Sequence, residues 1–454
     1  MNKIYTVIII FVLTAFAKTY AQEEMSVDII NDKMSAMLEE SQWDKMIPYG
    51  ERALRSGYDF FFLRARLGIA YYETGKYFKA ITNLERALEI GYDNPTVLED
   101  LYYCYLYTGR DDDRNFIYKK LPKNKQKRLK PLQNPLVDNL HSEIATGVSN
   151  DLDKNGSADL DGNDNFYGEQ TLSGNEFYFN IGLNQLPVNF LNVNYDFSYL
   201  KINNTKQLMF NNELISDEYP EYQSRFYNSY NVRIAPGFII SPAGQFIGIK
   251  YSALYADYDS TAYFSKDSSR YIFSVSEKEK FLNSFVLSLD ISKFITRFKI
   301  GLNGSFSYLN DVHQYQYGLS FKVFPFSKPN FSTYTNVIMH NQNDIANLII
   351  DQSFSGNVKY KFFYEIFATF GKMNNYNERN GFRIYNTDII NYKLGFETKY
   401  FFTTAFSGKF IYSYQSRERN YLTNDPGNFT DYSPQKMQLN YQVNNILFGL
   451  NYSF

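Results

Sequence analysis

The sequence is poor in the residues that most often form crosslinks or metal centres. Its 454 residues include one cysteine, Cys104, one tryptophan and three histidines. A single cysteine cannot form a disulfide within the chain, and Cys104 lies too far from the N-terminus to be a lipoprotein's acylated cysteine. We expect it to be an inert, buried residue. His141, His313 and His340 lie far apart and show no zinc-ligand spacing, so the sequence gives no support to zinc chemistry.

The chain also lacks an excess of charge and a long apolar run. A formal net charge of −2 gives no global basic field to hold phosphate backbones, so nucleic-acid binding is excluded. After the N-terminal region no segment has the 18 or more consecutive apolar residues of a transmembrane helix. If the protein is embedded in a membrane, it is therefore expected to cross with strands.

The N-terminus has the pattern of a signal peptide. Residues 1–21 combine Lys3, an apolar stretch from Ile4 to Phe16 and a small-residue ending at Ala21. The apolar run is shorter than the roughly 20 residues that span a bilayer, which favours cleavage over an uncleaved anchor helix. We predict secretion, with Gln22 as the first residue of the mature chain.

A repeat follows the signal peptide. Residues 51–59 read ERALRSGYD and residues 85–93 read ERALEIGYD, so Ala53 and Ala87 are equivalent positions 34 residues apart. A degenerate third copy begins near residue 105. The second copy resembles the tetratricopeptide repeat at its small, aliphatic and aromatic positions, which are Leu67, Gly68, Tyr71, Gly75, Ala80 and Leu84. It departs from the family pattern at Arg64 and at Pro95.

The resemblance implies paired antiparallel helices that stack into a short solenoid over residues 22–120. Small residues are expected where two helices cross closely. Such a solenoid can present a concave face to a periplasmic protein partner or a peptide, or it can act as a simple spacer. The basic, proline-flanked stretch that follows predicts a linker over residues 121–138.

From residue 139 the pattern changes to period two. In residues 298–308, aromatic and aliphatic side chains share one face of the predicted strand, whereas Lys299 and small polar residues share the other. The 42 tyrosines and 41 phenylalanines are typical of the aromatic girdles at a membrane interface. Fourteen strands are predicted, near residues 140–148, 176–185, 190–201, 226–240, 245–256, 281–291, 295–308, 312–323, 331–340, 345–354, 361–371, 385–401, 405–416 and 438–454.

The predicted connections alternate in length, as they do in outer-membrane barrels. Residues 186–189, 241–244, 292–294 and 403–404 are short turns, and those at the opposite end, residues 149–175, 202–225, 257–280, 372–384 and 417–437, are mostly long. Short periplasmic turns and long extracellular loops are typical of such barrels, and an even strand number places both ends of the barrel in the periplasm. The sequence therefore predicts an α + β multidomain protein, a tetratricopeptide α-solenoid followed by an antiparallel transmembrane β-barrel of about 14 strands over residues 139–454.

The chain ends on an alternating strand. Its last residues, GLNYSF, resemble the C-terminal signal by which the outer-membrane barrel assembly machinery recognises its clients, with Gly449, Tyr452 and Phe454 at the key positions. The resemblance implies two partners, that machinery and outer-membrane lipid.

An acidic segment after the first strand suggests a cation site. Asp151, Asp153, Asn155, Asp159 and Asp161 are spaced like the first ligands of a calcium loop, but Gly162 stands where its bidentate glutamate is expected. A weak calcium site and a solvated acidic loop both remain open, and no other cofactor is expected.

The predicted inward positions carry charges, which indicates a slightly basic lumen able to select an anionic solute or, if the charges pair, to plug a narrow barrel. No nucleophile motif accompanies His313 or His340, so a lipid-acting enzyme is the least favoured reading and we expect no enzyme activity. The predicted lumen residues are Arg233, Lys250, Lys299, Lys322, Glu397, Lys399 and Lys409.

The order of signal peptide, repeats and barrel resembles three groups of outer-membrane proteins: YaiO-like barrels, exopolysaccharide-export porins and surface-lipoprotein translocators. The resemblance implies a barrel with a periplasmic docking module that exports or displays a polymer, either polysaccharide or protein. A plugged barrel that acts as a surface scaffold or adhesion protein is the alternative.

Overall fold

The structure is a computed structural model. It describes residues 25–129, 137–156, 167–210, 213–258, 273–326, 330–358, 361–378, 388–423 and 435–454. The chain divides into two compact units between Cys104 and Tyr105. The predicted signal peptide, residues 1–21, lies outside the described residues.

The first unit consists of helices whose starting points repeat. Helices α2 (Val27–Glu39), α4 (Phe61–Glu73) and α6 (Pro95–Thr108) begin 34 residues apart, and so do α3 (Trp43–Arg55), α5 (Tyr77–Ile90) and α7 (Asp111–Lys120). Helix α6 runs across the boundary between the units, and α7 belongs to the second unit. Helix α8 (Lys123–Leu129) occupies much of the segment that was predicted to be an irregular linker. Helices therefore cover most of residues 25–120, although α7 belongs to the same unit as the barrel.

Small residues allow close helix packing in this unit, as the repeat pattern predicts. A Cβ atom on Gly68 of α4 would lie 2.5 Å from Leu84 Cδ2 of α5, so only glycine fits between these helices. Leu63, Leu67 and Leu84 are almost fully buried at this contact. Cys104 is also buried, and burial raises the pKa of its thiol well above the ordinary value. The cysteine therefore has the protected environment that the sequence predicts.

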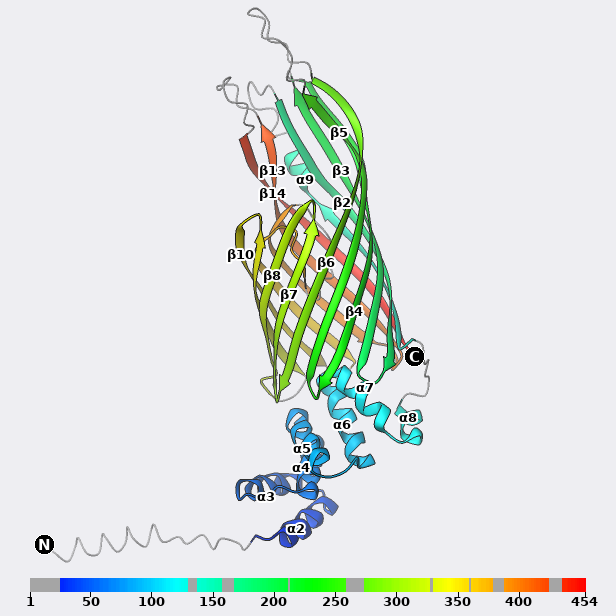
Figure 1. Ribbon diagram of the computed structural model, residues 1–454, viewed down its shortest axis with the longest axis vertical. Helices are drawn as coiled ribbons and strands as arrows, with labels where there is room; N and C mark the ends of the chain where they lie inside the picture. Colours follow the sequence, from blue (N-terminus) through cyan, green and yellow to red (C-terminus); the bar gives the residue numbers. More distant parts are fainter. Residues whose placement is uncertain are drawn as a thin grey trace, which may run out of the picture. The chain divides into compact units, whose positions relative to one another are not determined.

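The second unit contains a closed barrel of fourteen antiparallel strands, in which every strand pairs with its neighbours in sequence and β1 closes the ring against β14 (Figure 1). The predicted strand number and the predicted antiparallel closure are confirmed. The strands are β1 (Asn139–Ser149), β2 (Tyr167–Val188), β3 (Leu191–Phe210), β4 (Glu213–Ala235), β5 (Phe238–Tyr258), β6 (Phe273–Ile295), β7 (Phe298–Leu309), β8 (Val312–Val323), β9 (Phe331–Gln342), β10 (Ile345–Val358), β11 (Phe362–Met373), β12 (Ile389–Phe401), β13 (Phe406–Thr423) and β14 (Gln435–Ser453).

The two ends of the barrel differ. The strand start Asn139 and the strand end Ser453 are paired at one end, which we call the turn end. The opposite end, which we call the far end, has two-residue hairpins at Asn310–Asp311 and Asn343–Asp344, whose positive φ angles suit the right-handed twist of the flanking strands. Strands β2 to β6 are 20 to 23 residues long, much longer than β7 to β9, and the extra length lies at the far end.

Three details of the predicted connections are wrong. Residues 292–294 were expected to be a turn, but they lie inside β6, and the turn falls at Thr296–Arg297. Residues 202–225 were expected to be a long loop, but β3 and β4 continue through them and stay in register from Leu191–Val232 to Phe210–Glu213. Residues 241–244 were expected to be a turn, but they lie inside β5, and the turn falls at Pro236–Gly237. Polar and turn-forming residues therefore misled the prediction, because strands that rise beyond the apolar band have no need of apolar side chains.

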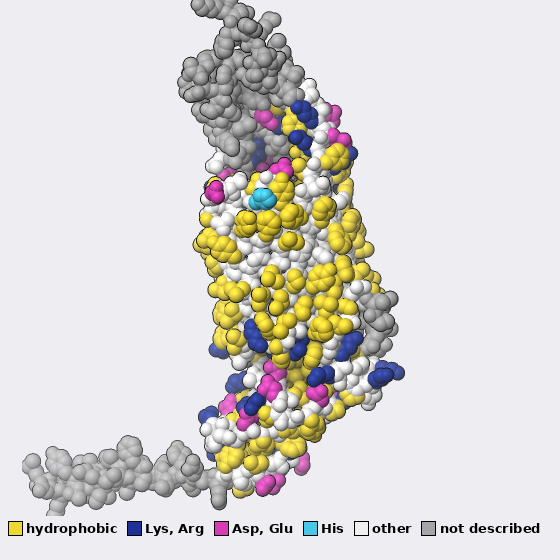
Figure 2. Space-filling view, in the orientation of Figure 1, with side chains coloured by type: hydrophobic (Ala, Val, Ile, Leu, Met, Phe, Trp, Pro, Cys, Tyr) yellow, Lys and Arg dark blue, Asp and Glu magenta, His cyan; other side chains and the backbone are white. Residues whose placement is uncertain are grey.

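The outer surface of the barrel is apolar around its middle (Figure 2). Tyr315, Tyr317, Leu319 and Phe321 of β8 are each more than 40% exposed on one face of the strand, whereas Gln316 and Ser320 are buried on the other. The predicted alternation in residues 298–308 is confirmed in the same way, with Leu302 exposed and Ser307 buried. Apolar side chains outside and polar ones inside are the pattern of a membrane-spanning barrel.

Among the described residues, no helix combines the length and the apolar character needed to cross a membrane.

Candidate functional site

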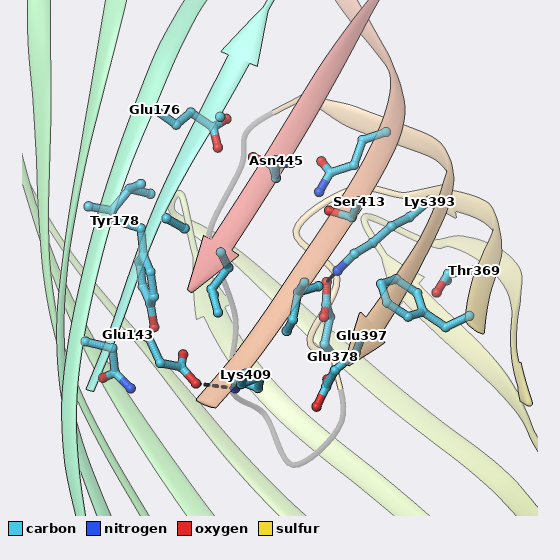
Figure 3. Close-up of a pocket in the computed structure, with 18 of the residues that line it drawn as sticks. Glu143, Glu176, Tyr178, Thr369, Glu378, Lys393, Glu397, Lys409, Ser413 and Asn445 are labelled. Atoms are coloured by element: carbon cyan, nitrogen blue, oxygen red, sulfur yellow. Dashed lines mark hydrogen bonds and ion pairs between the residues drawn. The ribbon is translucent and has the colours of Figure 1, made fainter. Parts of the chain in front are cut away.

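A cavity of about 540 Å³, which we call the main cavity, lies in the lumen of the barrel. Its walls come from β10 to β14 and from β1 to β4, which form one continuous arc because β1 pairs with β14. Figure 3 shows how side chains from these strands converge on it. Every second residue of a strand faces the lumen, so strands that are distant in sequence contribute polar side chains to the same cavity.

The lining of this cavity is acidic. Seven carboxylates face three lysine or arginine side chains and one histidine; the carboxylates are Glu143, Glu176, Asp196, Asp351, Glu365, Glu378 and Glu397. The predicted sign of the lumen, slightly basic, is therefore wrong for this cavity. The prediction left out Glu143, Glu176 and Asp196, although each lies on the polar face of a strand whose other face is apolar, so the alternation itself could have found them.

Most of the carboxylates are held by partners on other strands. Glu143 of β1 pairs with Lys409 of β13 (Figure 3). Arg417 Nη1 lies 2.7 Å from Glu176 Oε1, with both side chains almost fully buried. His141 Nε2 lies 2.7 Å from Asp196 Oδ1. These pairs join β1, β2 and β3 to one another or to β13 across the closure of the barrel, so they fix the shape of the cavity as well as its charge.

Two acidic residues oppose each other directly. Glu365 of β11 and Glu397 of β12 are cross-strand partners in the register, and both line the main cavity. Like charges at opposed positions disfavour strand pairing, so this arrangement is costly for folding alone. A site that attracts cations is one use for such a pair.

The segment after β11 folds into the lumen. Tyr376 Oη donates to Asp351 Oδ2 at 3.0 Å, and Asn377 Nδ2 donates to Ser307 Oγ at 3.0 Å. Lys393 Nζ lies 2.8 Å from Glu378 Oε1. The sequence placed residues 372–384 in an extracellular loop, yet residues 374–378 divide the lumen instead. Nothing in their composition signals this, because an amide-rich segment suits an exposed loop equally well.

A short helix also enters the lumen near the far end. Helix α9 (Asp151–Asn155) follows β1 and packs against β2 and β14. Asp151 is fully buried, and its carboxylate accepts from Arg419 Nε, from the Ser173 N–H at 2.9 Å and from Asn155 Nδ2 at 2.7 Å. Arg419 Nε lies 3.0 Å from Asp151 Oδ2. The structure thus gives Asp151 a cation from the protein itself.

These contacts bear on the calcium hypothesis. Asp153 is exposed, and Asn155 bonds to Asp151 rather than facing the same point in space. Asp159 and Asp161 lie outside the described residues. Within the described part of the chain no group of acidic, histidine or cysteine side chains is arranged to hold a metal ion. The calcium site stays a prediction.

A second cavity, of about 260 Å³, lies beside β6 to β10. Lys299 and Lys322 line it together with Asp290 and the inserted residues Tyr376, Asn377 and Glu378. Glu365 and Glu378 line both cavities, so the inserted segment separates them. The lumen as a whole is divided and polar.

The predicted lumen residues are placed as follows. Glu397 and Lys409 line the main cavity, and Lys299 and Lys322 line the second. Lys399 lies two residues from Glu397 on the same face of β12, and Arg233 is buried near the turn end. Lys250 is the exception, because it shares the outer face of β5 with the exposed Phe246 and pairs with Glu279.

The error at Lys250 has a clear cause. On β5 the inward face carries Ile247 and Ile249, which pack with Val286 and Leu309 in an apolar cluster. Both faces of this strand segment are therefore apolar, and alternation alone does not show which one faces the lumen.

Two further sets of predicted residues are also located. Phe448, Leu450 and Tyr452 of β14 are exposed on the outer face, and Gly449 lies between them on the inner face beside Glu143 and Lys409. The Phe454 N–H donates to the Asp138 carbonyl at 2.9 Å, which ties the C-terminus to the start of the barrel. His313 is stacked on the outer face against Phe306, whereas His340 is buried inside. The two histidines therefore cannot form one site.

Comparisons with known proteins find similarity to solved structures alone. No protein-family model and no curated protein matches the sequence. Among solved structures, a Pseudomonas aeruginosa FadL homologue is similar with a TM-score of 0.44 and 7% identity over 70% of this chain and 90% of that one. The Pseudomonas putida toluene transporter TodX is similar with a TM-score of 0.41 and 6% identity over 71% and 93%.

A bacterial polysaccharide outer membrane secretin is similar with a TM-score of 0.33 and 10% identity over 71% of this chain and all of that one. All three are outer-membrane barrels by their fold. At these levels of similarity, nothing about the solute of this chain follows from theirs. Its function has to be argued from its own lumen.

Proposed function

We propose that the chain is an outer-membrane channel protein that conducts hydrophilic solutes and prefers cations. The observation that carries this proposal is the main cavity, a space of about 540 Å³ in the lumen that is lined by seven carboxylates against three basic side chains. A low-dielectric wall around such a lining concentrates cations and repels anions. The apolar outer face and the closed strand order support insertion in a membrane.

The N-terminal helices add a docking role to this proposal. Their starting points recur every 34 residues, which suits a tetratricopeptide-like solenoid with a face for a periplasmic protein or a polymer. In this reading the turn end of the barrel faces the periplasm, and the channel exports or displays a polymer that the helices receive. A diffusion channel alone has no need of such a module.

A second candidate is favoured by the inserted segments. Helix α9 and residues 374–378 both occupy the lumen and are anchored by side-chain bonds. A barrel that is permanently filled in this way would act as a surface scaffold whose tall hairpins, β3–β4 above all, present a binding surface. Conductance separates this candidate from the channel.

The test is single-channel recording of the full chain, refolded into a planar bilayer with a potassium chloride gradient. The channel proposal predicts discrete current steps and a reversal potential displaced toward that of potassium. A reversal potential displaced toward chloride would overturn the cation preference, and silence of protein whose folding is verified by heat-dependent gel migration would favour the scaffold.

A further inference from the structure

Helix α7 meets the barrel at the turn end through one fully buried carboxylate. Asp113 is 0% exposed, and Arg233 Nε of β4 lies 2.6 Å from its Oδ1. The N–H of Gly237, in the turn between β4 and β5, donates to both carboxylate oxygens at 3.1 Å. Gly237 adopts a φ of +65°, which a residue with a side chain adopts only with strain. The barrel thus provides a shaped anion site for a residue of the helix.

The same carboxylate is held from its own helix. Arg110 Nη2 lies 2.7 Å from Asp113 Oδ2, and the Arg110 guanidinium also lies over the rings of Tyr105 and of Phe294 in β6. The Arg233 guanidinium lies 4.0 Å from the centre of the Phe116 ring. Both arginines are more than nine-tenths buried. We call Asp113, Arg110, Arg233 and Gly237 the latch.

The first turn of α7 also faces basic side chains on distant strands. Asp112 interacts electrostatically with Lys299 of β7. Asp111 interacts with Lys399 of β12, although it is exposed and its Oδ1 lies 2.8 Å from Arg114 Nη1 of the same helix. In the closed ring β4, β7 and β12 are well separated, and Lys299 and Lys399 belong to inward-facing positions. A helical turn that contacts β4 and acts electrostatically on β7 and β12 is placed toward the opening of the lumen rather than outside its wall.

We propose that α7 is a built-in plug, which the latch holds over the turn-end mouth of the lumen. The plug narrows the route between the main cavity and the turn end, and its release widens that route. This inference rests on the proposed channel function, because a plug regulates flow only where flow exists. Thiol labelling measures whether α7 restricts access to the lumen, and bilayer recording measures whether the barrel conducts ions, so the two proposals are tested separately.

The occlusion readout is the reactivity of a thiol inside the lumen near the turn end. In a full-length Cys104→Ala background, Ser292→Cys places a reporter on the inward face of β6, where Ser292 is 3% exposed and lines the second cavity with Lys299. A polymer-linked maleimide reaches it slowly while the plug is seated. A second reporter, Ser173→Cys, lies near the far end beside Asp151 and serves as the position control.

Three substitutions release the plug: Asp113→Asn, Arg233→Gln and Arg110→Gln. Each removes one charge from a buried ion pair, for which the loss of one partner leaves an uncompensated charge. Arg110→Gln leaves the barrel sequence untouched and therefore controls for misfolding of the barrel. The matched control is Asp28→Asn, the same change in the first turn of α2, where the side chain is exposed.

We expect each latch variant to raise the labelling rate at Ser292→Cys at least tenfold, with no change at Ser173→Cys and none for Asp28→Asn. Conductance in the bilayer should rise in the same variants. Fast labelling of the unaltered chain, or unchanged labelling in all three variants with normal heat-dependent gel migration, would overturn the plug. Faster labelling without any current would support the plug and count against the channel instead.

Discussion

Replacing Asp151 separates a structural ion pair from a calcium site. In the structure its carboxylate is fully buried and accepts three hydrogen bonds, from Arg419, Ser173 and Asn155. Arg419 is 3% exposed and also donates to Gln170 Oε1 at 2.8 Å. Asp151→Ala leaves the guanidinium without its anion and the Ser173 N–H without its acceptor.

The expected loss is large for a single substitution. Breaking a buried ion pair by removing one partner costs about 3–5 kcal/mol of unfolding free energy. Gln170 still accepts from Arg419, which puts the expectation at the lower end of this range. Asp151→Asn keeps the size of the side chain and one acceptor, so its loss should be smaller, about 1.5–3 kcal/mol for hydrogen bonds to a charged group. Asp153→Ala, on an exposed residue of the same helix, should change stability by less than about 0.5 kcal/mol.

The assay is urea unfolding of the refolded protein in lipid vesicles, followed by far-ultraviolet circular dichroism, with calcium or with a chelator. Fluorescence is unsuitable, because the single tryptophan, Trp43, lies in helix α3 rather than in the barrel. If Asp151 forms only an ion pair, the unfolding free energy should be lowest for Asp151→Ala, intermediate for Asp151→Asn and highest for the unaltered chain. Calcium should change none of these values.

A calcium site predicts a different pattern. A ligand that binds only the folded state stabilises it by an amount that grows with its concentration, so calcium would raise the midpoint of the unaltered chain. Asp153→Ala would then lose that gain although it does not touch Arg419. Calcium-dependent stability that both Asp151 and Asp153 variants abolish would refute the reasoning from the buried pair.

Three further predictions concern the lumen and the plug. Glu397→Gln removes one carboxylate of the pair opposed to Glu365 and should lower the cation preference of the channel roughly twofold. The estimate follows because a unit charge about 10 Å from the ion in water contributes ~0.4 kcal/mol. Glu279→Gln, on the outer face of β6, is the control and should leave the reversal potential unchanged. Burial, together with the neighbouring Asp111 and Asp113, raises the pKa of Asp112 to about 6 against the opposing effect of Lys299 and Arg114. Because the seated plug binds this proton more tightly than the released one, whose pKa is near 3.8, seating is disfavoured above about pH 6 and strengthened as pH falls from 7.5 to 5. The labelling rate at Ser292→Cys, divided by that at Ser173→Cys to cancel the loss of reactive thiolate at low pH, should fall several-fold over that range, and Asp112→Asn should remove the change in this ratio; a ratio that rises at low pH would contradict the sign. Tyr376→Phe combined with Asn377→Ala removes the bonds to Asp351 and to Ser305 and Ser307, and should raise single-channel conductance if residues 374–378 restrict the lumen; unchanged conductance in a folded, conducting variant would show that the restriction lies elsewhere.

Much of the fold followed from local pattern. The alternation near residues 295–308 and 312–323 predicted strands that the structure confirms to within three residues, with Leu302 and Leu319 on the outer face. This works where one face meets lipid, because every second residue must then be apolar. The same reasoning failed on β5, whose inward Ile247 and Ile249 pack in an apolar cluster and leave no contrast between the faces.

The site was less predictable than the wall. Lys299, Lys322, Glu397 and Lys409 were expected in the lumen and line its cavities. Tyr376, Asn377 and Asp151 act inside the barrel but lie in segments that read as surface loops. A loop sequence has no period, so it does not show whether its polar side chains meet water or the polar interior of a barrel.

The sequence by itself determined the class of structure. A 34-residue repeat specifies a helical segment, and fourteen alternating stretches specify a closed antiparallel wall, because helical packing and strand burial both depend on residues that are near one another in the chain. Only the tertiary structure decided what occupies the lumen. The pairs of Asp113 with Arg233 and of Asp151 with Arg419 join residues more than one hundred positions apart, and charges so distant in sequence find each other only after the barrel has closed.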